Sequence, residues 1–293
     1  MKPTKATRPG NPEGRSSLPR AQLLAALLTF ILALPGLAAA EPSAECPLHV
    51  GNKRLVIIID DMGYNLARGR DALALPGNIT YAVIPYTPFS RQLAQQADTA
   101  GKEVMLHTPM STLQDTPLER GGLTAEQAKQ EFRDTLTAAI EQIPEARGIN
   151  NHMGSDLTQR RPQMAWLMQE LRGRDMYFVD SRTSEKTVAA TVAAEFSVPH
   201  LSRQVFLDNE RTAEAIDERF KVLLSRLQEA PVAVGIGHPY PETITYLQEA
   251  LPKLAAQGID LAFVSEALAE QRPLEIASAD CNYSLTSTPR SAI

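Results

Sequence analysis

Carboxylate, imidazole and amide side chains stand at the ends of short apolar runs in this sequence, each just before a turn. The set comprises Asp60, Asp61, His107, Asn150, Asn151, His152, Asp180 and His238. One carboxylate oxygen and two imidazole nitrogens would leave an open position on a catalytic zinc ion. Such a metal lowers the pKa of bound water, while a second carboxylate and a further histidine can accept and donate protons. These residue types therefore suit metal-assisted hydrolysis.

Short apolar runs alternate with segments of helical periodicity, and these elements must position the polar set. The runs predict eight strands, at Leu55–Asp60, Ile79–Pro85, Glu103–His107, Gly148–His152, Met176–Asp180, Arg203–Asp208, Val232–His238 and Leu261–Ser265. Thr124 and Gln127 have the spacing of a capping box before an apolar stripe that ends at Ile143. Further helices are predicted over Gln163–Arg172, Thr212–Gln228 and Glu242–Gln257, the last with a kink at Pro252.

Strands and helices that alternate in this way predict an α/β fold, either a (β/α) barrel or a large doubly wound sheet. Most of the apolar runs lack polar alternation, as expected of parallel strands that are buried on both faces. In a parallel barrel the carboxyl ends of all strands lie on one rim, where the βα loops build active sites. The sequence contains neither G-x-G-x-x-G nor G-x-x-x-x-G-K-[ST], which disfavours a nucleotide-binding sheet.

The first 40 residues have the composition of an export signal. A basic leader precedes the apolar segment Leu23–Leu37, and Ala38-Ala39-Ala40 offers a small-residue cleavage site. Pro35 and Gly36 interrupt the apolar segment, which is shorter than the roughly 20 residues of a spanning helix. We therefore expect a cleaved signal peptide at residues 1–40, no stable membrane span and a periplasmic or secreted protein. An uncleaved inner-membrane anchor is the alternative.

The mature chain is expected to divide into a linker at residues 41–53, a barrel domain at residues 54–270 and a polar tail at residues 271–293. The whole chain has a net charge of −5, and loss of the basic leader would make it more negative. This charge argues against nucleic acid or an anionic membrane surface as the main partner. Cys46 and Cys281 are expected to form a disulfide in an oxidising compartment, with two free thiols as the alternative.

Five short motifs resemble those of a known protein family. They are Ile58-Ile59-Asp60-Asp61-Met62-Gly63, Leu106-His107-Thr108-Pro109-Met110, Asn150-Asn151-His152-Met153-Gly154-Ser155, Phe178-Val179-Asp180-Ser181 and Gly237-His238-Pro239. Their order and spacing are similar to those of the divergent polysaccharide deacetylase family, relatives of the chitooligosaccharide and peptidoglycan deacetylases. The likeness runs from about Leu55 to Glu266.

The resemblance implies a distorted (β/α) barrel with a divalent metal, usually zinc, on its rim. By motif, Asp60 corresponds to the general base, Asp61 and His107 to metal ligands, and His238 to the general acid. The usual second metal histidine, four residues after the first, is here Ser111, so His152 is the expected replacement ligand. We also place Asp180 among the catalytic groups and Asn150, Asn151 and Ser181 at the substrate.

Three functions compete at this point. The leading hypothesis is an exported metal-dependent hydrolase that removes N-acetyl groups from a cell-envelope glycan. A catalytically inactive barrel that binds glycan or peptidoglycan is the alternative, favoured by the loss of the second motif histidine. A glycosidase with paired carboxylates is disfavoured, because neighbours such as Asp60 and Asp61 point to opposite sides of an extended strand.

Overall fold

A computed structural model of the chain describes residues 53–269. The predicted signal peptide, the polar tail and both cysteines of the predicted disulfide, Cys46 and Cys281, lie outside these residues. Within residues 53–269, no helix is both long enough and apolar enough to cross a membrane.

Nine parallel strands form one sheet in the described part of the chain. They are β1 (Lys53–Met62), β2 (Ile79–Val83), β3 (Glu103–Met110), β4 (Ala146–Met153), β5 (Tyr177–Asp180), β6 (His200–Ser202), β7 (Val205–Phe206), β8 (Val232–Gly237) and β9 (Ile259–Leu261). Their order is β6-β5-β4-β3-β2-β1-β8-β7, and β9 pairs with the start of β1. All the strand pairs are parallel, as the apolar runs predicted.

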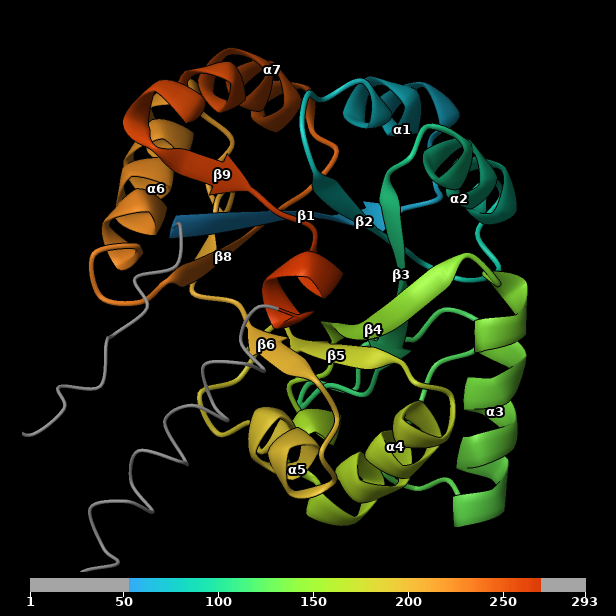
Figure 1. Ribbon diagram of the computed structural model, residues 1–293. Helices are drawn as coiled ribbons and strands as arrows, with labels where there is room; N and C mark the ends of the chain where they lie inside the picture. The colour runs from blue at the N-terminus through green and yellow to red at the C-terminus, as the bar shows by residue number, and fades with distance from the viewer. Residues whose placement is uncertain (1–52, 270–293) are drawn as a thin grey trace, which may run out of the picture. The chain divides into compact units, whose positions relative to one another are not determined.

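The two edges of this sheet are strands that follow each other in the chain. Only Arg203 and Gln204 separate β6 from β7. The Arg203 N–H donates to the Asp180 carbonyl beside β6, whereas the Gln204 N–H donates to the Val234 carbonyl in β8. Two successive residues therefore bond to β5 and β8, the strands next to the two edges, and the sheet curls into a distorted barrel (Figure 1). The predicted barrel is confirmed, and the doubly wound sheet is excluded.

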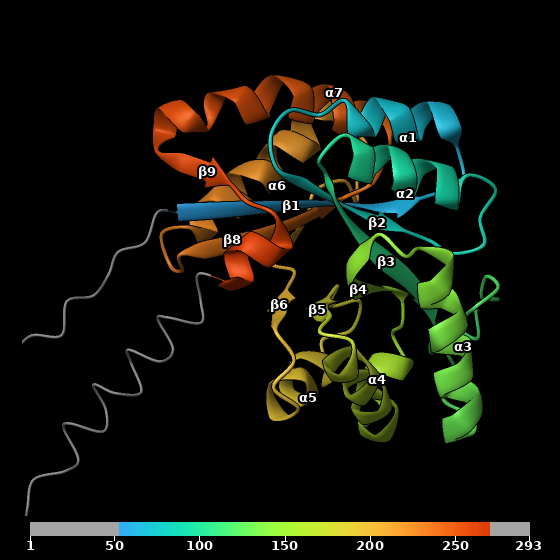
Figure 2. The same ribbon diagram turned by 45° about the vertical axis from the view of Figure 1, so that its right-hand side comes forward.

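Helices follow most strands and cover the outer face of the sheet (Figure 2). They are α1 (Leu66–Leu73), α2 (Ser90–Thr99), α3 (Lys129–Gln142), α4 (Arg161–Gly173), α5 (Ala189–Glu195), α6 (Ala213–Arg226) and α7 (Pro241–Ala250). Alternate residues of β1 divide between two apolar cores: Leu55 and Ile57 pack outward under the helices, while Val56 and Ile58 fill the barrel interior. Burial on both faces explains the unbroken apolar run.

Residues 264–269 are helical and close the end of the barrel at which the strands begin (the red helix near the centre of Figure 1). Their apolar side chains belong to the interior core. Glu103 Oε1, at the start of β3, accepts hydrogen bonds from Thr80, from Tyr177 and from the backbone N–H of Ser265. The loops at the other end of the barrel, after the strands, are left to form a site.

Several predicted boundaries need correction. The predicted strand Arg203–Asp208 contains only the short β7, and β6 was missed. The predicted strand Leu261–Ser265 is wrong beyond Leu261, because the helix at residues 264–269 follows. The helix predicted to reach Gln257 ends as α7 at Ala250, since Pro252 cannot continue it.

The predicted capping box forms only in part. Gln127 Oε1 accepts the backbone N–H of Thr124, but α3 begins later, at Lys129. Thr212 behaves as expected of an N-cap, because its hydroxyl accepts the N–H of Ala215 at the start of α6.

Candidate metal centre

Asp60 and Asp61 end β1 at a β-bulge. Between the pairs Ile59↔Tyr81 and Met62↔Val83, β1 contains one more residue than β2. Asp61 has a φ of 56°, in the left-handed region. The bulge breaks the alternation of the strand, so that both carboxylates face one imidazole. His107 Nε2 lies 3.6 Å from Asp60 Oδ2 and 3.2 Å from Asp61 Oδ1. The expectation that these carboxylates point to opposite sides is therefore wrong.

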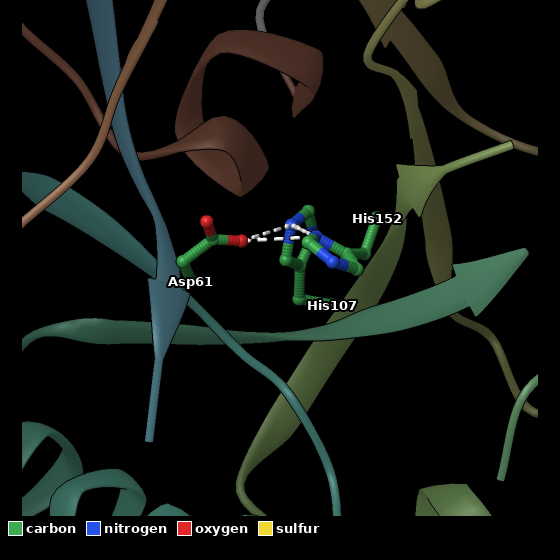
Figure 3. A group of neighbouring side chains, drawn as sticks. All are labelled: Asp61, His107 and His152. Atoms are coloured by element: carbon green, nitrogen blue, oxygen red, sulfur yellow. Dashed lines mark hydrogen bonds and ion pairs between the residues drawn. The ribbon is translucent and has the colours of Figure 1, made fainter. Parts of the chain in front are cut away.

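Three ligand atoms converge beside the bulge (Figure 3). Asp61 Oδ1 lies 3.2 Å from His107 Nε2 and 2.9 Å from His152 Nδ1, and the two nitrogens are 3.1 Å apart. A tetrahedral zinc ion with bonds of about 2.0–2.1 Å would separate its ligand atoms by about 3.3 Å. Asp61 Oδ1 is also buried and has no hydrogen-bond partner within the described residues. These three residues fit a divalent metal, and they are the three predicted as ligands.

His107, from β3, is oriented by a buried amide. Asn150, from β4, places its Oδ1 2.7 Å from His107 Nδ1 and donates from Nδ2 to Asp60 Oδ1 at 2.8 Å. Because an amide oxygen only accepts, His107 Nδ1 carries a proton, and Nε2 is the nitrogen that faces Asp61 and His152 and would bind a metal. One asparagine thus fixes both a ligand and the neighbouring carboxylate.

The electrostatics distinguish the two carboxylates. Burial raises the pKa of Asp60, although the charges of His107 and His238 oppose this rise. For Asp61, burial also opposes ionisation, but the adjoining His107 and His152 lower its pKa well below the usual range. Asp60 is therefore the more basic carboxylate and Asp61 the anionic one.

His238 approaches the same place from the end of β8. Its Nδ1 lies 2.8 Å from Asp208 Oδ1, and its Nε2 lies 3.9 Å from Asp61 Oδ2. The other Asp208 oxygen accepts the backbone N–H of His238 and the hydroxyl of Thr243. Burial alone would lower the pKa of His238, but its bond to Asp208 and the nearby carboxylate charges raise this pKa to about 9. His238 is therefore a protonated donor that faces the cluster.

Asp180 lies at the end of β5, as predicted, but its oxygens are used within its own loop. The side chain is fully buried. Oδ1 accepts the backbone N–H of Arg182 at 2.8 Å, and Oδ2 accepts the hydroxyl of Thr187 at 2.9 Å. These bonds give Asp180 the task of holding the loop after β5, rather than contact with a reacting group.

The residues expected at the substrate need correction. Asn150 and Asn151 are 0% and 1% exposed, and the amide of Asn151 bonds the backbone of Met153 and Ser181. Ser181 is also buried. All three side chains are therefore away from solvent, and those of Asn150 and Asn151 connect the strand ends to one another.

Four residues near the site were not predicted. Asp208 could have been found, because it ended the predicted strand Arg203–Asp208, in the position that marked the other residues. Glu119 and Tyr64 lie in loops, where no strand end marks them. Ser111 occupies the position of the second metal histidine of the usual motif, and its hydroxyl donates to Asp156 Oδ2 at 3.1 Å.

Comparison with known proteins agrees with this geometry. A model of the divergent polysaccharide deacetylase family matches residues 57–268. The chain is 35% identical over 201 residues to an uncharacterized protein of Haemophilus influenzae (strain ATCC 51907 / DSM 11121 / KW20 / Rd), covering 69% of this chain and 72% of that one. It is 36% identical over 211 residues to the uncharacterized protein YibQ of Escherichia coli (strain K12), covering 72% and 66%.

Two solved structures show the same fold. An uncharacterized protein from Agrobacterium tumefaciens C58 superposes with a TM-score of 0.71 at 20% identity, over 74% of this chain and 89% of that one. A protein from Enterococcus faecalis V583 superposes with a TM-score of 0.54 at 17% identity, over 74% and 99%. With the family match over most of the described residues, the conclusion is that this chain belongs to the divergent polysaccharide deacetylase family.

Proposed function

We propose that this protein is an exported, metal-dependent hydrolase that removes N-acetyl groups from a cell-envelope polysaccharide or oligosaccharide. The observation that carries the proposal is the convergence of Asp61, His107 and His152 beside a basic carboxylate, Asp60, and a protonated histidine, His238. Family membership points the chemistry toward deacetylation.

A divalent metal held by the three ligands, for which we propose zinc, would supply Lewis acidity to the acetamide carbonyl and lower the pKa of the attacking water. Asp60 accepts the proton of that water, because burial raises its pKa and its second oxygen stays free of the Asn150 bond. Asn150 keeps Asp60 beside His107 while the proton moves.

His238 donates a proton to the departing amine. Asp208 holds Nδ1, so Nε2 is the nitrogen that faces the cluster, 3.9 Å from Asp61 Oδ2. A pKa near 9 keeps this ring protonated at neutral pH until a leaving group takes its proton. The pair of a buried base and a carboxylate-held acid supports hydrolysis over simple binding.

The location and the substrate rest on the sequence and on the family. The segment at residues 1–40 supports export to the periplasm or the medium. A neutral N-acetylated glycan of the cell envelope is compatible with the negative net charge of the chain, which argues against nucleic acid as the main partner.

Acetate release tests the proposal. Purified protein loaded with zinc is incubated with N-acetylated oligosaccharides and with peptidoglycan, and free acetate is measured. We expect release by the wild type, and a loss of about 10²–10⁴-fold in Asp60→Asn with zinc still bound. If the wild type binds zinc and glycan but releases no acetate from any substrate, the alternative of an inactive glycan-binding barrel is correct.

A further inference from the structure

The two ring nitrogens of His152 face different surroundings. Nδ1 points into the metal centre, 2.9 Å from Asp61 Oδ1. Nε2 points outward and lies 3.7 Å from Glu119 Oε1. Glu119 belongs to the loop between β3 and α3. Neither the family motifs nor the strand ends include this glutamate.

The carboxylate of Glu119 is held in place by its neighbours. The Tyr64 hydroxyl, from the loop after β1, donates to Glu119 Oε1 at 2.7 Å. The next residue, Arg120, places its guanidinium 4.6 Å from the centre of the Tyr86 ring. Gly121 has a φ of 85°, and a Cβ there would lie 2.7 Å from the same ring. The loop therefore packs closely beside Tyr86, and this packing fixes the position of Glu119.

Glu119 also retains unused acceptor capacity. Its Oε2 is buried and has no hydrogen-bond partner within the described residues. A buried carboxylate oxygen without a donor is costly, unless a donor is supplied in another state of the site. The only polar hydrogen that the outward face of His152 can offer is that of Nε2.

We propose that Glu119 is a positioning residue that accepts the Nε2–H of His152 and thereby fixes Nδ1 as the metal-binding nitrogen. A shift of about 1 Å brings the contact into hydrogen-bond range. A carboxylate on the outer nitrogen orients a ligand histidine and raises its basicity. This inference rests on the proposed function, because it assumes that the cluster binds a metal.

Zinc affinity without any substrate tests the inference. The full chain is titrated with zinc against a competing chelator, for the wild type, Glu119→Gln and Glu119→Ala. We expect about tenfold weaker binding in Glu119→Gln and a loss approaching about a hundredfold in Glu119→Ala. The matched control is Asp115→Asn, which removes the same charge from an exposed position of the same loop and should leave the affinity unchanged.

A spectroscopic measurement separates positioning from a merely structural role. With cobalt(II) in place of zinc, the ring N–H protons of the ligand histidines give shifted, exchangeable NMR signals. We expect Glu119→Gln to move the signal of His152 Nε2–H and speed its exchange, while that of His107 Nδ1–H, bonded to Asn150, stays unchanged.

The outcomes distinguish this inference from the function on which it rests. Unchanged zinc affinity or an unchanged His152 signal in Glu119→Gln, in a protein that still releases acetate, would overturn the inference alone. A wild type that binds no zinc would overturn the proposed function together with it.

Discussion

The metal centre has two halves that differ in how the fold holds them. The inner half consists of Asp60, Asn150 and His107, which lie on three strands and join through contacts of 2.8 and 2.7 Å. The outer half consists of His152, at the end of β4, with Glu119 and Tyr64 from two loops, at distances of 3.7 Å from His152 to Glu119 and 2.7 Å from Tyr64 to Glu119. The side chain of His107 is 2% exposed, whereas that of His152 is 18% exposed.

The difference teaches how one site can be both rigid and accessible. The inner half is set when β1 and β3 pair on either side of β2 and β4 pairs with β3, because its residues fill the barrel end and its polar atoms satisfy one another. The outer half depends on a loop that can adjust without disturbing the sheet. Asp61, at the bulge, belongs to both halves, because its Oδ1 lies 3.2 Å from His107 Nε2 and 2.9 Å from His152 Nδ1. We therefore expect inner substitutions to affect stability and metal binding, and outer ones metal binding alone.

The largest contrast is expected between the two ligand histidines. His107→Ala and His152→Ala should each lower zinc affinity by more than about a hundredfold, since each removes a ligand. Only His107→Ala should also lower the free energy of unfolding of the metal-free protein, by about 2–3 kcal/mol, because it leaves Asp60 and Asn150 buried without their partner. Urea unfolding in excess chelator measures this difference. Equal losses of stability would remove the distinction between the halves.

A somewhat smaller effect is expected from the amide that connects the inner half. Asn150→Ala should lower the free energy of unfolding by about 2 kcal/mol, because Asp60 Oδ1 and His107 Nδ1 both lose a hydrogen bond in a dry environment. Asn209→Ala is the matched control at an exposed asparagine, with an expected change within about 0.5 kcal/mol. If both variants unfold at the same urea concentration, the Asn150 bridge is not what holds the inner half.

The third imidazole near the site, His238, should make the stability of the protein depend on pH. His238 is held by a buried carboxylate, and its pKa rises from 6.5 to about 9 on folding. Its contribution to stability is therefore complete below about pH 6.5 and is lost as the pH rises through about 9. In metal-free protein, the free energy of unfolding of the wild type should fall by roughly 1–2 kcal/mol more than that of Asp208→Asn between pH 6.5 and about pH 9, as measured by urea unfolding. Parallel pH profiles of the two proteins would contradict the assignment of the bond to His238⁺.

The same division explains how much of the site the sequence could predict. Residues of the inner half follow apolar runs, and parallel strands bring such ends together, so the sequence alone predicts Asp60 and His107. The same reasoning reached Asp61 and His152. It placed the side chain of Asp61 wrongly, because period-two alternation assumes a regular strand and the bulge inserts one residue.

The site residues that the sequence could not predict lie in loops, where no periodic pattern of apolar residues marks them. Glu119 and Tyr64 are 55 residues apart and meet only because the loops after β3 and β1 fold over one rim. Asn150 is polar and lies near the end of a strand, so it was expected at the substrate, whereas its amide lies between two other site residues. Residues 262–265 were expected to continue a strand that begins at Leu261, because a short apolar run does not distinguish strand from helix.

The stoichiometry of zinc in the purified protein tests the central claim most directly. Metal-free wild type and Asp61→Ala are each equilibrated with zinc, separated from free metal and analysed for zinc per chain. The geometry of Asp61 Oδ1, His107 Nε2 and His152 Nδ1 predicts one tightly held zinc in the wild type and its loss in Asp61→Ala, the ligand shared by both halves. A wild type that retains no zinc, or an Asp61→Ala variant that retains as much as the wild type, would contradict the account.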